Sequence, residues 1–316
     1  MAVFTKLNQE EIINFINTYN IGKLESFNEI IEGIENTNYK IVCNNTPYIL
    51  TIFEKRVNEK DLPFFIDLKL YLNNNNFKCP KPVKNKNDKI INSLKNKKAI
   101  IISFIEGEKI IKPSVNECYE VGKAIGDLHN LSKNFNNKKE NSLSINELKR
   151  IFYKCQNNNQ NEFNHICNEL EKEIKFIENS YPKNLPTGII HADLFKDNIF
   201  FIEEKISGVI DFYFSCYDYL LYDICIVIND WCFENNGNDF NKEAFNAVLK
   251  GYKLSRTLEN SEINSFNIIL RLASLRILIT RLHDYLFHPI DAIVVKKDPY
   301  EYFKILQWHQ TNKVVL

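Results

Sequence analysis

The sequence has no net charge, no closely spaced cysteine pair and no long apolar run. Its 40 lysines and arginines balance 40 aspartates and glutamates, so no excess charge draws the chain toward nucleic acid or an anionic membrane. No stretch reaches the roughly 18 apolar residues that a membrane span needs, and the opening MAVFTKLNQEE has no apolar signal segment. We therefore expect a cytoplasmic protein whose partner is a small molecule.

Cysteine and glycine give little structural or chemical information of their own. The 8 cysteines are scattered without the C-x-x-C spacing of zinc or redox sites, and most lie in apolar runs, so we expect reduced core residues. Only 9 glycines are present, whereas asparagine is abundant. Asparagine tracts such as residues 73–76 and 157–159 are expected to mark loop tips.

The first part of the chain has the pattern of a small α+β lobe. Its apolar residues, within a composition that is 44% hydrophobic, alternate in short strands that follow one amphipathic helix and enclose a second. The expected elements are helices over 8–20 and 61–72 and strands over 24–31, 38–43, 47–53, 89–92 and 97–107. Five strands with one inserted helix predict a small antiparallel sheet.

Beyond Gly107 the pattern becomes mainly helical. It is interrupted between Ile189 and Phe214 by short apolar runs that are typical of strands. The change of pattern predicts two lobes, residues 1–105 and residues 106–316, of which the second is larger and mainly helical.

The interruption contains the run HADLFKDNIFFIEEKISGVID, residues 191–211. Asn198 opens a strand, EEKISG turns the chain, and Asp211 ends the returning strand. Because the strands of a hairpin run side by side in opposite directions, its first and last residues lie at the same end. Asp193, on the loop that leads into the hairpin, is expected to overhang the same place.

Two carboxylates and an amide oxygen gathered at one strand end suit phosphoryl transfer. Asp193, within hydrogen-bond reach of a substrate alcohol, would take its proton as the bond to phosphorus forms. Asn198 and Asp211 would supply oxygen ligands to Mg²⁺, which needs only one or two protein oxygens besides the ATP phosphates. These residues predict an ATP- and Mg²⁺-dependent kinase of a small hydroxyl-bearing metabolite.

The pattern H-x-D-x4-N, followed thirteen residues later by an aspartate, resembles the catalytic and metal-binding loops of the aminoglycoside phosphotransferase-like kinases. The resemblance covers nearly the whole chain, and within that family it is greatest to the homoserine kinases. The segments that carry it are MAVFTKL, EGIENTNYKI, PYILTIFEKR, DLPFF, GIIHADLFKDNIFF, GVIDFYF, DICIVINDWCFE, RLHDYL and KDPYEY.

This resemblance implies an α+β, two-lobed protein-kinase-like fold. Residues 1–105 would be a nucleotide-binding lobe and residues 106–316 a catalytic and substrate-binding lobe. The implied reaction is transfer of the γ-phosphoryl group of ATP to the hydroxyl of L-homoserine, which supplies O-phosphohomoserine for threonine synthesis.

The resemblance also places the nucleotide. A turn between the first two strands would cover the phosphates, and the linker after the fifth strand would hydrogen-bond the adenine. The implied residues are Gly33, Asn36, Thr37 and Asn38 in the turn from Glu32 to Tyr39, and Ser103, Phe104, Ile105 and Glu106 in the linker.

The third strand departs from the family pattern. A cation that pairs with the phosphates is expected there as Y-x-L-K or Y-x-L-R, but YILT places Thr51 at that position. Lys55 or Arg56 at the end of the same strand would serve instead, or the pairing is absent. The acidic partner on the following helix would be one of three residues, Glu59, Asp61 or Asp67.

Homoserine is a zwitterion, so its site needs a cation for the carboxylate, preferably arginine, and an acidic group for the ammonium. The candidates are Asp230, after DICIVIN, and Arg276, Arg281 and Asp284 on ILRLASLRILITRLHDYL, where residues three and four apart share a helix face. Asp193 would contact the reacting hydroxyl. The alternative is an internal Arg–Asp pair that serves only the fold.

Three further residues match the family as structural support. Asp223, in YDYLLYDICIV, corresponds to an aspartate that braces the catalytic loop, and His129, in GDLHNL, to a helix histidine. His191 would support the loop by hydrogen bonds rather than move protons.

Other functions are open. A choline or ethanolamine kinase is compatible with EGIENTNYKI and with an aromatic cage, whereas an aminoglycoside kinase would favour an acidic pocket that a charge-balanced chain does not suggest. The cage candidates are Phe212, Tyr213, Phe214, Tyr217, Tyr219, Tyr222 and Trp231. From another class, Thr51 and the glycine-poor turn would suit a nucleotide-binding regulatory protein without turnover, but the intact base and metal ligands argue against it.

Overall fold

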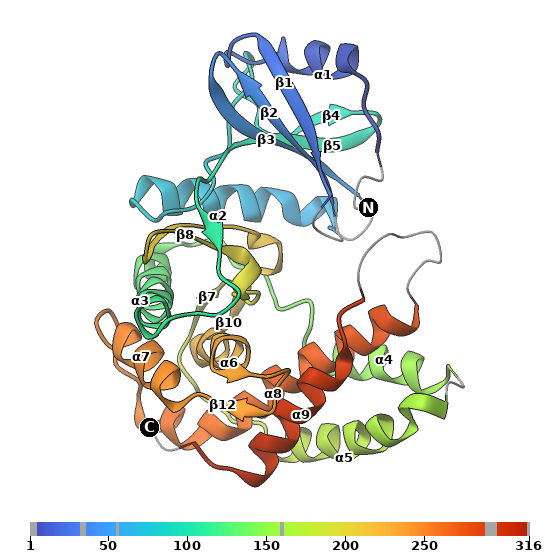
Figure 1. The fold of residues 1–316 in the computed structure, drawn as a ribbon, viewed down its shortest axis with the longest axis vertical. Helices are drawn as coiled ribbons and strands as arrows, with labels where there is room; N and C mark the ends of the chain where they lie inside the picture. Colours follow the sequence, from blue (N-terminus) through green and yellow to red (C-terminus); the bar gives the residue numbers. More distant parts are fainter. Residues whose placement is uncertain (1–4, 32–35, 55–56, 159–160, 288–295, 315–316) are drawn as a thin grey trace. The chain divides into compact units, whose positions relative to one another are not determined.

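The computed structural model describes residues 5–31, 36–54, 57–158, 161–287 and 296–314. The described residues form two units. We call them the sheet unit, within residues 1–106 and 208–213, and the helical unit, within residues 107–207, 214–288 and 296–316. Figure 1 follows the chain through both.

The sheet unit is built on a five-stranded antiparallel sheet with the order β1-β2-β3-β5-β4. Its elements are α1 Gln9–Ile16, β1 Leu24–Ile30, β2 Asn36–Cys43, β3 Thr46–Phe53, the 3-10 turn η1 Glu59–Asp61, α2 Leu62–Asn74, β4 Asn92–Leu94 and β5 Lys97–Ser103. The inserted helix and the number of strands are as the sequence predicts. Strand β4, however, starts at Asn92 rather than at Lys89.

Asparagine makes tight turns that glycine would make in other proteins. Asn44 and Asn45, between β2 and β3, have φ values of 45° and 59°, as a two-residue type I′ turn requires. Asparagine accounts for seven of the twelve non-glycine residues with positive φ in the described ranges, because its short polar side chain tolerates the left-handed region. The abundance of asparagine therefore has a structural use in a glycine-poor chain.

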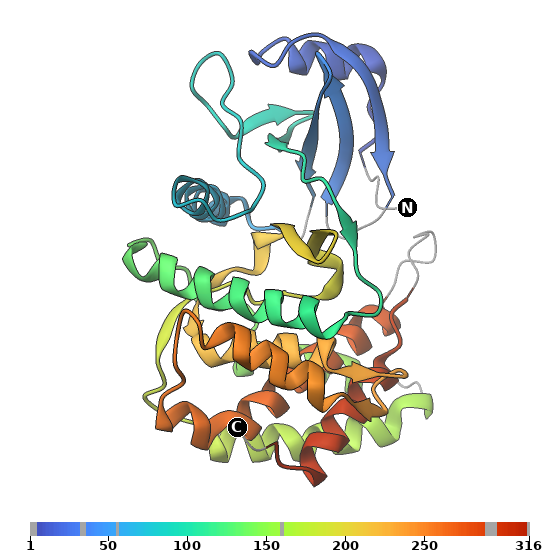
Figure 2. The same ribbon diagram turned by 60° about the vertical axis from the view of Figure 1, so that its left-hand side comes forward.

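Different helices cover the two faces of the sheet (Figures 1 and 2). Ile52 of β3 belongs to a buried cluster that includes the apolar face of α1. Since side chains alternate along a strand, Phe53 faces the opposite side, where its ring lies 5.2 Å from that of Tyr213. Tyr213 in turn lies 5.6 Å from the ring of Phe65 in α2. Helix α2 therefore covers the face that Thr51 shares with Phe53.

The helical unit contains short strands among longer helices. Its helices are α3 Val115–Leu131, α4 Ile145–Gln156, α5 Asn164–Ser180, α6 Leu220–Trp231, α7 Lys242–Tyr252, α8 Asn260–Leu286 and α9 Pro299–Thr311, with 3-10 turns η2 Ser132–Asn134, η3 Asn161–Phe163, η4 Lys196–Asn198 and η5 Phe212–Phe214. Its strands are β6 Glu108–Lys109, β7 Thr187–Ile190, β8 Ile199–Ile202, β9 Lys205–Val209, β10 Cys216–Tyr219, β11 Phe233–Glu234 and β12 Asp239–Phe240, paired as β6-β8-β9, β7-β10 and β11-β12. The last residues of β9 and the first residues of η5 belong to the 208–213 segment of the sheet unit.

Helices α6 and α8 form the centre of the helical unit. Nearly every residue of α6 is buried, and α8 packs against α4, α5, α6 and α9. Among the described residues α8 is the one helix long and apolar enough to cross a membrane by length and composition, but most of its apolar window is buried inside the protein. It thus has the position of a core helix.

All eight cysteines are free and buried. Burial raises the pKa of several of their thiols, to about 12 for Cys79 and Cys118, so these groups stay protonated at neutral pH. The prediction that the cysteines are reduced core residues is confirmed.

Helices α3 and α7 lie side by side (Figure 2) and approach closely because each has a glycine at the contact. A Cβ atom on Gly122 would lie 1.9 Å from the backbone oxygen of Val248, and one on Gly251 would lie 2.0 Å from that of Tyr119. Each backbone occupies the space that a side chain on the other helix would need.

We predict that Gly251→Ala destabilises the protein by about 3 kcal/mol, because the new methyl group would force α3 and α7 apart. Alanine favours helices over glycine by roughly 1 kcal/mol, so propensity alone predicts the opposite sign. Gly126→Ala is the matched control on α3, where the Cβ atom would meet its nearest neighbour at 2.9 Å. Urea unfolding should show a smaller loss for the control, and equal stability of all three proteins would contradict the close contact.

His309 of α9 makes stability sensitive to acid. Its Nε2 lies 2.7 Å from Oδ1 of Asn229, and burial, followed by the charge of Arg271, lowers its pKa to about 3. The unfolded state binds a proton at this histidine near the ordinary pKa of about 6.5. The stability that the buried neutral His309 contributes is therefore complete above that pH and is lost as the pH falls toward 3. At pH 5 we expect a loss of about 2 kcal/mol. The test is to measure the free energy of unfolding of the wild type and of His309→Gln at pH 7.5 and at pH 5. Between these pH values the variant should lose less stability than the wild type, and equal losses would contradict the role of His309.

Candidate active site

The 191–198 loop, which joins β7 to β8, is fixed by one buried carboxylate. Asp223, in the first turn of α6, accepts hydrogen bonds from the backbone amides of His191 and Ala192, both at 2.7 Å. Ala192 has a φ of 63°, a strained value for this residue type that needs such support. These bonds determine the direction in which the chain leaves β7 and approaches Asp193.

His129 of α3 holds the other side of this carboxylate. Its Nε2 lies 3.2 Å from Oδ2 of Asp223, and its Nδ1 lies 3.0 Å from the Tyr252 hydroxyl. Burial raises the pKa of Asp223, but hydrogen bonding and charge from His129, with smaller contributions from His191, outweigh it and keep the pKa below its ordinary value. The carboxylate therefore stays ionised as an acceptor for the loop amides.

Asp193 and Asn198 form a hydrogen-bonded pair within the loop. The Asn198 Nδ2 donates to the Asp193 backbone oxygen at 2.8 Å and to its Oδ2 at 3.0 Å. The Asp193 amide donates to Nδ1 of His191 at 3.2 Å. With its amide nitrogen engaged in this way, Asn198 has its amide oxygen left as the atom that a cation would use.

Arg276 of α8 is the second support of Asp193. Its Nη1 donates to the backbone oxygen of Ala192, and its Nη2 lies 3.5 Å from Oδ1 of Asp193. Its side chain is only 3% exposed, against 15% for Asp193. The sequence suggested Arg276 as a substrate contact, whereas the structure places it against the loop that presents Asp193.

Asn198 and Asp211 flank one hairpin, as expected. Asn198 ends η4 immediately before β8, and β8 and β9 are neighbours joined by Glu203 and Glu204. Asp211 lies two residues beyond β9 with a φ of 63°, so it follows the strand rather than ending it. The chain path brings the start of β8 and the end of β9 to the same end of the hairpin.

The C-terminal end of α6 contacts the same loop. Asp230 Oδ2 accepts a hydrogen bond from the Lys196 amide at 2.8 Å, and Trp231 Nε1 donates to the Leu194 oxygen at 3.2 Å. Burial raises the pKa of Asp230 above its ordinary value, although the charge of Lys196 opposes the shift. Asp230 therefore lies beside the segment that follows Asp193.

The charged residues predicted on α8 do not form one group. Arg281 pairs with Glu301 of α9 and lies 4.4 Å from the ring of Tyr302, while Asp284 lies 3.5 Å from Nδ1 of His283. Arg276 forms an internal Arg–Asp pair, the alternative that the sequence left open, but its partner is Asp193 on the 191–198 loop, at 3.5 Å.

The predicted phosphate turn is shorter than the sequence suggested. Gly33 and Lys55 lie outside the described residues, but Asn36, Thr37 and Asn38 already belong to β2. Thr37 is fully buried, and its hydroxyl bonds to Glu54 at 2.8 Å and accepts from the Thr5 amide. The assignment of Thr37 to the turn is therefore wrong, because cross-strand packing extends β2 toward its N-terminus.

The linker residues 103–106 differ in how far the fold engages them. Ser103 ends β5, its amide donates to the Lys81 oxygen at 2.9 Å, and its hydroxyl accepts from the Lys81 amide. The Lys40 ammonium lies over the Phe104 ring, 4.2 Å from the ring centroid. The Ser103 amide is thus engaged in the fold, and Phe104, Ile105 and Glu106 are the remaining candidates for contact with the base.

Lys69 is a charged residue that sequence reasoning missed. It lies inside α2 with 2% of its surface exposed, and its Nζ lies 3.3 Å from the Tyr213 hydroxyl. Burial lowers its pKa to about 8, against the opposing charges of Cys79 and Asp211. The sequence signal for its burial is the helical spacing of four from Phe65, whereas the neighbouring Leu70 is more exposed.

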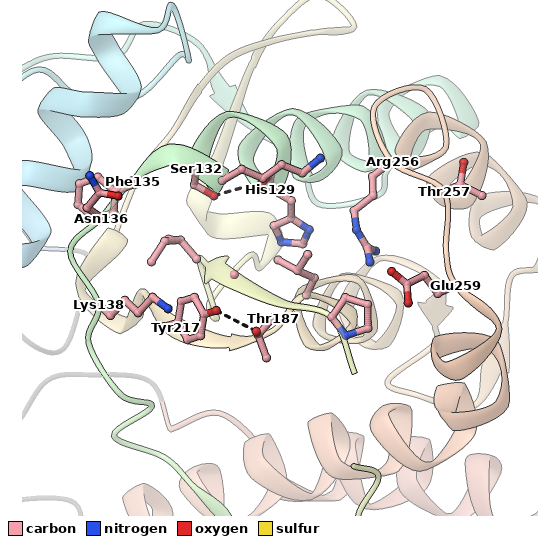
Figure 3. A pocket seen from close by; sticks show the side chains of 15 residues that line it. His129, Ser132, Phe135, Asn136, Lys138, Thr187, Tyr217, Arg256, Thr257 and Glu259 are labelled. Atoms are coloured by element: carbon pink, nitrogen blue, oxygen red, sulfur yellow. Dashed lines mark hydrogen bonds between the residues drawn. The ribbon is translucent and has the colours of Figure 1, made fainter. Parts of the chain in front are cut away.

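A pocket of about 590 Å³ in the helical unit is lined by none of Asp193, Asn198 and Asp211. Figure 3 shows Tyr217 bonded to Thr187 on one side and Arg256 and Glu259 on another, with His129 between them. Arg256 is already bound to both carboxylate oxygens of Glu262. His129, which lines the pocket and bonds to Asp223, links the pocket to the support of the 191–198 loop.

The aromatic residues proposed for a cage have different partners. Tyr213 packs on Phe53 and Phe65, and Tyr217 lies beside Lys138. Tyr219 donates from its hydroxyl to the Pro182 oxygen, and Trp231 bonds to Leu194. The described residues thus offer no observation that favours recognition of a quaternary ammonium.

Comparison with solved structures supports the fold class. An amicoumacin kinase in complex with AMP-PNP and Ca²⁺ aligns with a TM-score of 0.72 and 16% identity, covering 96% of this chain and 92% of that one. A spectinomycin phosphotransferase aligns with a TM-score of 0.67 and 13% identity, covering 96% and 94%. The expected protein-kinase-like fold is confirmed.

Comparison of sequences extends the likeness. The homoserine kinase of Agrobacterium fabrum is 40% identical over 98% of this chain and 96% of its own length. The homoserine kinase of Parvibaculum lavamentivorans is 39% identical over 98% and 96%. A model of the phosphotransferase enzyme family matches residues 26–253. The chain therefore belongs to the phosphotransferase enzyme family.

Proposed function

We infer that this chain is a homoserine kinase, which transfers the γ-phosphoryl group of ATP to the hydroxyl of L-homoserine and so supplies O-phospho-L-homoserine for threonine biosynthesis. The observation that carries this inference is the likeness to homoserine kinases over 98% of the chain and about 96% of theirs. It includes α6 and α8, which contact the loop, as well as the loop itself. A cytoplasmic location suits such small water-soluble substrates.

In the proposed mechanism Asp193 is the general base. Asn198 and Arg276 hold its carboxylate in one orientation, so little reorganisation is needed when the substrate hydroxyl arrives. Asp193 would take the hydroxyl proton as the oxygen attacks the γ-phosphorus.

Asn198 and Asp211 are the proposed Mg²⁺ ligands. No group of three or more His, Cys, Asp or Glu residues that could hold a metal occurs in the described ranges. An amide oxygen and one carboxylate fit Mg²⁺, which completes its shell with nucleotide phosphates and water. When bound, the ion would neutralise charge on the phosphates during transfer.

Asp230 and Arg281 are the proposed contacts for the ammonium and carboxylate of the substrate. The hydrogen bond from Lys196 keeps Asp230 beside the 191–198 loop, and the positive charge of Arg281 attracts the Asp230 carboxylate. Arg276, by contrast, is committed to the loop, so we assign it to the orientation of Asp193.

The substrate assignment predicts the outcome of a panel assay. Purified protein with ATP and Mg²⁺ should release ADP with L-homoserine but not with choline, ethanolamine, methylthioribose or kanamycin, and a chelator should stop the reaction. Turnover with choline in place of homoserine would replace this assignment with the choline kinase alternative. ATP binding without turnover on any acceptor would indicate a regulatory protein.

The role of Asp193 predicts that Asp193→Asn lowers kcat by about a thousandfold, because the amide cannot accept the proton. The MgATP dissociation constant should remain near the wild-type value. Asp197→Asn is the matched control, since Asp197 lies on the same loop and pairs with Lys297 at 2.9 Å where both side chains are about half exposed. Near-normal turnover of the Asp193 variant would remove it from the base role.

A further inference from the structure

Lys69 has a charge that folding does not explain. Its ammonium is removed from water within α2, and the desolvation of a buried ion often exceeds what its partners return. A methionine of similar length would fill the same space without this penalty. A local feature that opposes stability is expected mainly where function requires it.

The surroundings of Lys69 point toward Asp211. The Nζ lies 3.3 Å from the Tyr213 hydroxyl and 4.6 Å from the centre of its ring. Tyr213 follows Asp211 by two residues, and the Asp211 carboxylate attracts the ammonium electrostatically. The charge of Lys69 therefore acts on the segment that contains the proposed metal ligand.

The same face of the sheet has no cation on β3. Thr51 is buried there, and its hydroxyl donates to Oδ1 of Asn38 at 2.8 Å. Of the other lysines of the sheet, Lys97 and Lys98 of β5 pair with Glu54 and Glu59, and Lys40 of β2 lies over the Phe104 ring. Helix α2, which covers the face that Thr51 shares, brings Lys69 to the side where the strand cation is missing.

We propose that Lys69 supplies from α2 the positive charge that kinases otherwise carry on the third strand. It is a positioning residue, which orients Asp211 and offsets the repulsion between this carboxylate and the phosphates of ATP. The inference rests on the proposed function for the nucleotide and for Asp211, but it is independent of the acceptor alcohol.

The test is Lys69→Met, measured for MgATP binding in the absence of homoserine and for thermal unfolding. Loss of this charge should raise the MgATP dissociation constant about tenfold or more. The melting temperature should stay the same or rise, because the buried charge is gone. Among the kinetic constants, the KM for homoserine should change little. A merely structural lysine would give the reverse pattern, with lower stability and normal nucleotide affinity.

Three further variants make the test specific. Lys69→Met/Thr51→Lys moves the cation to the strand and should restore MgATP affinity at least in part. Lys98→Met removes the same charge from a partly exposed position on β5, where Lys98 lies 3.8 Å from Glu59, and should leave MgATP affinity near the wild-type value. Lys55→Met tests the other candidate cation.

Normal MgATP affinity of Lys69→Met, or a loss of MgATP affinity seen only in Lys55→Met, would overturn the proposal. A loss of affinity that only accompanies unfolding of Lys69→Met would overturn it as well. Because binding is measured without acceptor, a wild type that binds MgATP but ignores homoserine would refute the substrate assignment alone.

Discussion

The geometry of the loop that carries Asp193 depends on the buried carboxylate of Asp223. A carboxylate in the first turn of a helix is favoured by the helix dipole, and here it also accepts two backbone amides and contacts His129. An ionised group without water is stable only when its acceptor positions are used in this way. The positive φ of Ala192 follows from these bonds, and it sets where Asp193 leaves the strand. Helices α3 and α6 thus determine the position of a side chain that neither of them contains.

Both carboxylates of the proposed mechanism are associated with a cation from a helix interior. Arg276 of α8 contacts Asp193, and Lys69 of α2 acts on Asp211. Both cations are buried, so their attraction for the carboxylates is little screened by solvent. ATP brings further negative charge, which two unsupported carboxylates would repel. The interior of each unit therefore contributes charge as well as packing, and it accepts a cost in stability that an apolar core would avoid.

What could be predicted from the sequence was mostly local. Asp193 and Asn198 are five residues apart on one loop, and the hairpin after them follows from strand and turn patterns that the structure reproduces. Contacts between distant segments could not be inferred in this way. The burial of Thr37 depends on Thr5 and Glu54, the role of Arg276 depends on a loop 83 residues earlier, and Lys69 is buried by Tyr213, 144 residues away. Periodicity indicates that a helix face is buried but not which distant group it meets.

The two arginines of α8 show why helix position matters for the substrate. Each residue turns the helix by about 100°, so residues five apart point about 140° away from each other. Arg276 accordingly meets the loop, whereas Arg281 meets Glu301 and Tyr302 of α9. The sequence offered both as candidates because residues three and four apart share a helix face, but Arg276 and Arg281 are five residues apart. A zwitterionic substrate that engages Arg281 would compete with Glu301 and leave the Arg276 bond to Ala192 intact. Substrate recognition and orientation of the base can therefore vary independently, although both originate from one helix.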